Sequence, residues 1–118
     1  SRIALGLDNR PDVVAHWLAL NGLGASILPI NPDLRAEDLA YQLALGRPDL
    51  AVVLPERAAF VRGAADGRLP VVAPGEPPPR RPSPALRQRA HLEDECALLF
   101  TSGTTAKPKG CILSNDYF

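Results

Sequence analysis

The sequence has 118 residues, which is enough for one domain with a hydrophobic core but too few for two. Hydrophobic residues make up 46% and charged residues 22%, as in an ordinary soluble globular protein, and 13 basic side chains balance 13 acidic ones. This neutral balance excludes the strongly basic field of a nucleic-acid-binding domain, and no apolar run reaches the ~20 residues of a membrane span. Two cysteines, Cys96 and Cys111, are too few for a disulfide framework, so we expect reduced thiols and a cytoplasmic protein.

The first 73 residues alternate between strand and helix patterns. Residues 3–7 form an apolar run that predicts a buried strand, and residues 11–23 predict a helix that Asn9 is placed to cap. Four apolar side chains at helical spacing are expected to pack this helix on a sheet: Val13, Val14, Trp17 and Leu18.

The alternation continues along residues 25–73. Strands are predicted over 25–30, 50–54 and 69–72, and helices over 35–45 and, more weakly, 57–65. In the first of these helices, Leu39 and Leu43 form the expected buried stripe, and Gly46 is expected to end it. Because strands and helices alternate, we predict an α/β fold with a mostly parallel sheet flanked by helices on both sides.

Proline and arginine dominate the next segment, residues 74–94. Six of the 13 prolines lie between Pro74 and Pro84, a composition that fits neither a helix nor an interior strand. We predict an extended surface connection, and prefer it to the alternative of a proline-rich site for a partner.

Residues 95–118 complete the predicted domain. Strands are expected over 97–100 and 111–113, joined by a polar loop, and Ser114 is placed to cap the start of a further helix. The chain begins almost inside a strand and stops one turn into that helix. We therefore expect residues 1–118 to be one partial domain of a longer protein.

The polar loop has the composition of a phosphate-binding site. Residues 101–110 read Thr-Ser-Gly-Thr-Thr-Ala-Lys-Pro-Lys-Gly, and Lys107 and Lys109 are the only lysines in a chain whose other cations are arginines. Hydroxyls and backbone N–H groups donate hydrogen bonds to phosphate oxygens, glycine permits close approach, and lysine neutralises charge. The spacing does not fit the common Gly-Lys-Ser/Thr nucleotide loop, and composition alone leaves a polar hairpin turn as the alternative.

The same segment resembles the phosphate loop of the adenylate-forming (AMP-binding) superfamily, which includes acyl-CoA synthetases, peptide-synthetase adenylation domains and beetle luciferases. That loop reads Thr-Ser-Gly-Thr/Ser-Thr-Gly-x-Pro-Lys-Gly, and residues 101–110 match it at nearly every fixed position. Residues 3–10, the helix through Trp17 and the turn at 29–32 also look like the opening of that family's large N-terminal domain. The resemblance covers essentially the whole chain, least well over residues 74–89.

The resemblance implies an acid–thiol ligase of the acyl-CoA synthetase type, as in fatty acid metabolism. A carboxylic acid would react with ATP to give an acyl-adenylate and pyrophosphate, and coenzyme A would then accept the acyl group, with Mg²⁺ assisting. By this resemblance, the residues that would bind ATP are Thr101, Ser102, Gly103, Thr104, Thr105, Lys107, Lys109 and Gly110. The family's catalytic and metal-binding residues would lie beyond Phe118, so we assign neither here and expect the isolated chain to be inactive.

One position departs from the family pattern, and alternatives to this function remain open. Ala106 stands where the family usually has glycine, which costs ~1–2 kcal/mol if that position needs a positive φ. Thr104 favours a CoA ligase over a peptide-synthetase adenylation domain. The alternative from another class is an inert or self-associating α/β module that binds no nucleotide. The substrate acid is not predicted.

Overall fold

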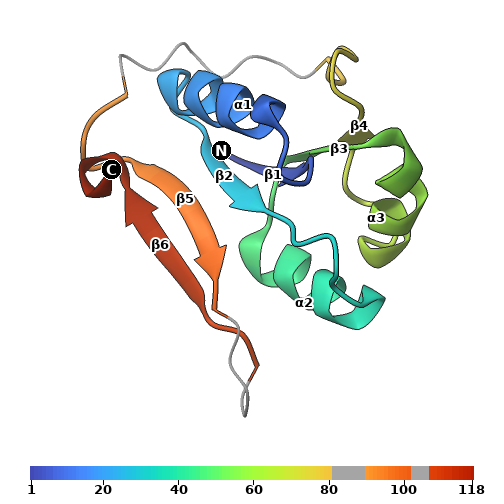
Figure 1. Cartoon of the computed structure of the whole chain (residues 1–118). Helices are drawn as coiled ribbons and strands as arrows, with labels where there is room; N and C mark the ends of the chain where they lie inside the picture. Colours follow the sequence, from blue (N-terminus) through green and yellow to red (C-terminus); the bar gives the residue numbers. More distant parts are fainter. Residues whose placement is uncertain (81–89, 102–106) are drawn as a thin grey trace.

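The computed structural model describes residues 1–80, 90–101 and 107–118, and these ranges contain one sheet with helices on both faces (Figure 1). The sheet has the strand order β4-β3-β1-β2-β5-β6. The strands are β1 (Arg2–Gly6), β2 (Ser26–Pro29), β3 (Leu50–Val53), β4 (Val71–Val72), β5 (Glu95–Phe100) and β6 (Gly110–Ser114). The helices are α1 (Pro11–Gly22), α2 (Ala36–Gly46) and α3 (Ala58–Ala64), with 3₁₀ turns η1 (Pro55–Arg57) and η2 (Asn115–Tyr117).

The sheet is parallel except at one edge. β1 pairs in parallel with both β2 and β3, β3 with β4, and β2 with β5, whereas β5 and β6 form an antiparallel pair. The β2–α2–β3 connection passes over β1, so α2 and α3 cover one face, while α1 covers the other. The predicted α/β fold, with a mostly parallel sheet between helices, is confirmed.

Strands β1 to β5 are apolar almost throughout because both faces of this part of the sheet are covered. Along β1, Ala4 packs into the cluster that contains α2 and α3, whereas Ile3 and Leu5 pack into the cluster on the α1 side. The same alternation separates Leu28 from Ile27 in β2. Successive strand side chains point to opposite faces, so β1 to β5 each contribute to both cores, whereas β6 at the edge is largely exposed.

Helix α1 differs from its prediction in its cap and in its buried face. Its N-cap is Arg10 and forms no side-chain cap bond, so the expected Asn9 cap is wrong. Val14 and Leu18 are 55% and 68% exposed. Val13 and Trp17 do pack on the sheet side as predicted, and Leu20 joins them there. The predicted buried face is therefore correct for Val13 and Trp17 and wrong for Val14 and Leu18.

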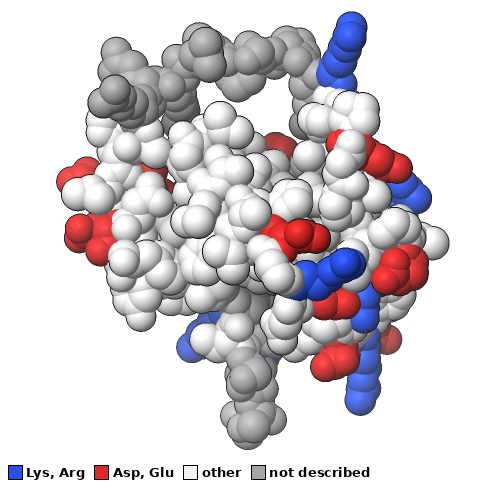
Figure 2. Space-filling model, turned by 45° about the horizontal axis from the view of Figure 1, so that its top comes forward, with Lys and Arg blue, Asp and Glu red and all other residues white. Residues whose placement is uncertain are grey.

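The face shown in Figure 2, which brings the top of Figure 1 forward, includes a broad area free of Lys, Arg, Asp and Glu. Most charged side chains in this view lie at its sides. Helix α1, at the top of Figure 1, contains one charged residue, Asp12, and leaves Val14 and Leu18 exposed. The molecule thus presents an apolar stripe on α1 that the sheet does not cover.

Helix α2 buries Leu39 and Leu43 as predicted, but it does not end on a glycine in the left-handed region. Arg47 takes that role, with φ 47°, and donates its backbone N–H to the carbonyl of Leu43. Gly46 is the last residue of the helix, and a Cβ there would lie 2.7 Å from Cδ2 of Leu28. Close packing against β2, rather than backbone conformation, therefore explains this glycine.

The remaining boundaries agree with the predictions to within a few residues. The helix expected over 57–65 is α3, preceded by η1, and the strand expected over 69–72 shortens to β4. β5 begins at Glu95, two residues earlier than expected. Ser114 occupies the N-cap position of a 3₁₀ turn without a side-chain cap bond, so the expected capping interaction is wrong.

The described parts of the connection at 74–94, residues 74–80 and 90–94, contain neither helix nor strand. Residues 81–89 lie outside the described part of the chain. None of the helices that the structure describes combines the length and the apolar character needed to cross a membrane.

Candidate functional site

The candidate site is the connection between β5 and β6. The antiparallel pairing ends with Phe100 opposite Gly110. One further pair closes it, because Thr101 donates its backbone N–H to the carbonyl of Lys109 at 3.0 Å and Lys109 donates its own to Thr101 Oγ1 at 3.3 Å. The two strands therefore fix both ends of the loop, which is where the sequence predicted a strand–loop–strand phosphate site.

The structure describes some of the predicted binding residues and not others. Thr101, Lys107 and Lys109 are exposed at the ends of the loop. The other predicted loop positions, together with the departing alanine, lie outside the described residues: Ser102, Gly103, Thr104, Thr105 and Ala106. The described hydroxyl and ammonium groups are thus accessible to a ligand in solution.

Gly110 has a packing role that the sequence analysis did not assign. A Cβ there would lie 3.0 Å from Cδ1 of Leu98 and 3.6 Å from the ring of Phe100. Its place in β6 lets that strand approach the side chains of β5 closely. Gly110 therefore shapes the hairpin on which the loop stands.

One described residue near the loop was missed by sequence reasoning. Tyr41 of α2 donates its hydroxyl to the carbonyl of Pro108 at 3.3 Å, and its ring centroid lies 5.3 Å from Nζ of Lys107. Tyr41 precedes Pro108 by 67 residues, so no local pattern in the sequence could have indicated the contact.

A hollow of about 650 Å³ adjoins the loop at the carboxyl ends of β1, β2 and β5. Its lining includes Asp8 after β1, Asn31 after β2, and Thr101 and Pro108 at the loop. In open parallel sheets, ligands bind at this edge, where successive crossovers leave to opposite faces. Here α1 leaves β1 toward one face and α2 leaves β2 toward the other. The loop therefore stands beside the part of the fold best suited to hold a ligand.

The turns around this hollow are held by short-range contacts. Asn31 accepts a hydrogen bond from the backbone N–H of Asp33 at 2.9 Å, the turn chemistry expected of asparagine. Arg57 donates to the carbonyl of Pro32 at 2.7 Å and lies 3.9 Å from a carboxylate oxygen of Asp8. The same guanidinium thus joins the segments that follow β1 and β2.

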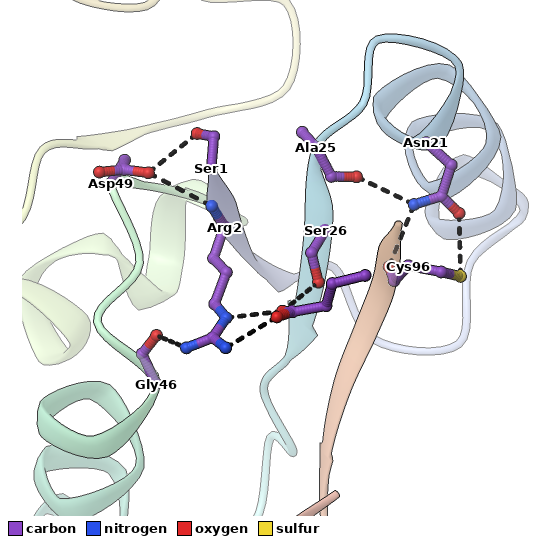
Figure 3. A network of polar contacts seen from close by, with 9 residues as sticks. Ser1, Arg2, Asn21, Ala25, Ser26, Gly46, Asp49 and Cys96 are labelled. Atoms are coloured by element: carbon purple, nitrogen blue, oxygen red, sulfur yellow. Dashed lines mark hydrogen bonds and ion pairs between the residues drawn. The ribbon is translucent and has the colours of Figure 1, made fainter. Parts of the chain in front are cut away.

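A polar network lies at the amino ends of the parallel strands, opposite the loop (Figure 3). Arg2 donates from Nε to Glu95 Oε1 at 2.6 Å and from Nη2 to Oε2 at 2.8 Å, and Ser26 donates to Oε1 at 2.7 Å. Arg2 also donates to the carbonyl of Gly46 at 2.9 Å. These contacts tie β1, β2, β5 and the end of α2 together.

The network shifts the titration of both charged groups. The hydrogen bonds from Arg2, supported by Ser26, hold the pKa of Glu95 below its ordinary value despite partial burial. The hydrogen bond to Glu95 raises the pKa of Arg2. Because this pair lies at the amino ends of the parallel strands, away from the loop, we assign it a structural role.

Among the described residues, no group of three or more His, Cys, Asp or Glu side chains could hold a metal ion. The described cysteines form no disulfide: Cys96 is buried, and Cys111 is exposed on β6. The described ends of the loop thus offer hydroxyl, backbone and ammonium groups, and the adjoining hollow adds the side chains of Asp8 and Asn31.

Comparison with protein families shows that the model of AMP-binding enzymes matches residues 1–118. Among curated proteins, the crotonobetaine/carnitine–CoA ligase of Salmonella paratyphi A is 31% identical over 97% of this chain and 26% of its own length. The feruloyl-CoA synthase of an Amycolatopsis species is 32% identical over 97% of this chain and 23% of its own length. The chain thus spans about a quarter of the length of these relatives.

Solved structures show the same architecture. VinN in complex with 3-methylaspartate is 25% identical, with a TM-score of 0.75 over 97% of this chain and 33% of its own. ATP-bound MatB from Rhodopseudomonas palustris is also 25% identical, with a TM-score of 0.75 over 98% of this chain and 25% of its own.

Proposed function

Because the chain belongs to the family of AMP-binding enzymes, we propose that it carries the ATP phosphate-binding loop of an ATP-dependent acid–thiol ligase. The observation that supports this proposal most directly is the hairpin at the sheet's carboxyl edge. It holds Thr101, Lys107 and Lys109 exposed beside the hollow lined by β1, β2 and β5. The CoA-ligase names of the relatives and the ATP-bound state of MatB agree with it.

In the proposed reaction, the substrates are ATP, a carboxylic acid and coenzyme A. The acid's carboxylate attacks the α-phosphorus of ATP, the bond to the β-phosphate breaks, and pyrophosphate leaves. The thiol of coenzyme A then attacks the acyl carbon and releases AMP. The net result is a thioester, AMP and pyrophosphate.

The loop acts on the charge of the leaving group in this proposal. Lys107 and Lys109 would lie beside the β- and γ-phosphates and stabilise the negative charge that pyrophosphate carries away. Thr101, together with Ser102, Thr104 and Thr105, would donate hydroxyl hydrogen bonds, and Gly103 would allow the backbone to approach. Mg²⁺ bound to ATP would supply further charge neutralisation, and we assign it no ligand among the described residues.

The binding part of the proposal is tested by titrating the 118-residue chain with Mg·ATP by calorimetry. We expect weak binding that falls at least tenfold in the Lys107→Ala/Lys109→Ala variant, because each charge-assisted hydrogen bond contributes about 1.5–3 kcal/mol. Arg68→Ala/Arg80→Ala is the matched control, since it removes the same charge from exposed positions. ATP affinity that is unchanged in the lysine variant would contradict the proposed site.

The reaction type is tested by measuring pyrophosphate release from the full-length natural protein that contains these residues. Pyrophosphate release that requires both a carboxylic acid and CoA would support the acid–thiol ligase. Release that an amino acid supports without CoA would favour the peptide-synthetase branch of the same family instead.

A further inference from the structure

Helix α2 contacts the segment through which the loop returns to the sheet. Tyr41 projects from α2 and is half-buried, with its hydroxyl 3.3 Å from the carbonyl oxygen of Pro108 and its ring centroid 5.3 Å from Nζ of Lys107. Two different parts of the side chain therefore contact two successive loop residues. The helix itself is fixed, because Leu39 and Leu43 on its inner face are buried in the core.

These contacts restrict a side chain that would otherwise move freely. The ring of Pro108 fixes its own φ and disfavours helical backbone at Lys107. A lysine side chain has four rotatable bonds and loses much conformational entropy when a ligand orders it. The Tyr41 ring, within ~6 Å of the ammonium, attracts it through a cation–π interaction and limits the positions that it samples.

We propose that Tyr41 is a positioning residue that presents the ammonium group of Lys107 to the phosphates of ATP. This inference rests on the proposed function, because it assumes that the loop binds phosphate. Lys109 offers an internal comparison, since no aromatic ring approaches its ammonium within the described ranges. The proposal therefore concerns Lys107 alone.

The first test observes the contact without any nucleotide. Lys107 and Lys109 are the chain's only lysines, so reductive methylation with ¹³C-formaldehyde gives one signal from each, plus one from the amino terminus. Methylation preserves the positive charge, and the ring current of Tyr41 should move the Lys107 signal upfield of the Lys109 signal. Lys107→Arg assigns the signal. The upfield position should persist in Tyr41→Phe and disappear in Tyr41→Leu.

The second test measures the functional consequence with unmethylated protein and Mg·ATP as the probe. Tyr41→Leu should weaken ATP binding about two- to fivefold, the range expected when an exposed cation–π interaction is lost. Tyr41→Phe keeps the ring and should restore most of the affinity. In the Lys107→Ala background, Tyr41→Leu should have no further effect, because the two residues act as a unit in a double-mutant cycle.

Tyr117→Leu is the matched control, because Tyr117 is the chain's other tyrosine, is 70% exposed and follows the end of β6 that lies away from the loop. If the chemical shift of the Lys107 signal is the same in Tyr41→Leu as in the wild type, the inference is overturned, whatever the ATP affinity. An upfield signal in a chain whose ATP affinity does not respond to Tyr41→Leu would likewise overturn it. Failure of Lys107→Ala/Lys109→Ala to weaken binding contradicts the proposed function instead, so the two failures are distinguishable.

Discussion

At the scale of single residues, Gly46 is a glycine that local sequence rules explain as a helix end. In the structure, close packing leaves no room for a side chain at this position. A Cβ there would lie 2.7 Å from Cδ2 of Leu28 and 3.4 Å from Cδ2 of Leu98. Leu28 is 1% exposed, so its side chain has little room to rotate away. The absence of a side chain at the end of α2 thus allows the helix to approach β2 and β5.

We expect Gly46→Ala to lower the free energy of unfolding by about 1–3 kcal/mol, because the added methyl group overpacks a filled core. Gly63→Ala in α3 is the matched control. A Cβ at Gly63 meets nothing within 4 Å, so this substitution should be neutral or should stabilise the chain by about 0.4–1 kcal/mol. Urea unfolding followed by circular dichroism measures both. Equal effects of the two substitutions would contradict the packing explanation.

Glu95 provides a second residue-scale prediction, on pH. Its lowered pKa means that, as the pH falls, the unfolded chain takes up the proton before the folded chain does. The stabilisation by its contacts with Arg2 and Ser26 is therefore complete above the ordinary value of 4.5 and is lost as the pH falls through the lowered value.

Glu95→Gln should accordingly reduce the free energy of unfolding by about 1–2 kcal/mol at pH 7, and by progressively less below pH 4.5. The exposed Glu93→Gln is the control, with an expected change within about 0.5 kcal/mol at both pH values. Urea titrations at pH 7 and pH 3 give the comparison. If Glu95→Gln lowers the free energy of unfolding by the same amount at both pH values, the ionised carboxylate is not the source of the stabilisation.

Sequence reasoning succeeded for residues whose role is local and failed for those whose partners are distant. The Asn31 turn follows from the amino acids beside it. Arg2 and Glu95, in contrast, are 93 positions apart, and nothing near either residue indicates the other. Tyr41 beside Lys107 is a case of the same kind, because only the folded sheet brings α2 next to the hairpin.

At the scale of secondary structure elements, α1 is held to the sheet by a polar contact at its last turn. Asn21 donates from Nδ2 to the carbonyl of Ala25 at 2.9 Å and to that of Cys96 at 3.0 Å, and its Oδ1 lies 3.3 Å from Sγ of Cys96. The side chain thus joins α1, the start of β2 and β5 (Figure 3). No α1 residue is fully buried, so this contact adds to the partly buried packing of Val13, Trp17 and Leu20 against the sheet.

Asn21→Ala should therefore lower the free energy of unfolding by about 1–3 kcal/mol, because it removes two hydrogen bonds to backbone carbonyls. Asn9→Ala is the matched control, since the expected cap by Asn9 is absent and its loss should cost less than about 0.5 kcal/mol. Unfolding curves followed through Trp17 fluorescence report on α1 directly. An Asn9→Ala effect as large as that of Asn21→Ala would contradict the observed geometry.

The existence and type of the elements were predictable because apolar runs and helical spacing are local properties. Their ends and faces were less so. β4 pairs only through Val71 and Val72. The length of a strand depends on how many residues of the neighbouring strand are placed to pair with it, and the local sequence does not show this. For α1, Val14 and Leu18 are as apolar as Val13 and Leu20, so composition could not decide which side faces the sheet. That choice is made by the direction in which the chain enters and leaves the helix.

At the scale of the whole molecule, the sheet order creates the candidate site. Reversal of the crossover direction after β2 places the ends of β1, β2 and β5 side by side, and the hairpin follows directly from β5. The sequence predicted a parallel sheet and a strand–loop–strand unit but not their relative placement. The hollow of about 650 Å³ beside the loop could therefore be found only in the assembled sheet.

The uncovered apolar stripe on α1 leads to the last prediction, which concerns association. Val14 and Leu18 lie one helical turn apart and are 55% and 68% exposed, and Trp17 beside them contacts Phe118 at 4.9 Å between ring centroids. With a formal net charge of zero, long-range repulsion does not oppose the approach of two copies. We therefore expect the chain to self-associate through α1 as its concentration rises.

Sedimentation velocity over a range of concentrations tests this expectation. Val14→Gln/Leu18→Gln should shift the population toward monomer, because two polar side chains make burial of the stripe costly. Leu92→Gln is the matched control: Leu92 is 67% exposed, close to the value for Leu18, but lies in the turn before β5. A monomer at every concentration would contradict the prediction, and an equal response to Leu92→Gln would assign the association to general hydrophobicity rather than to α1.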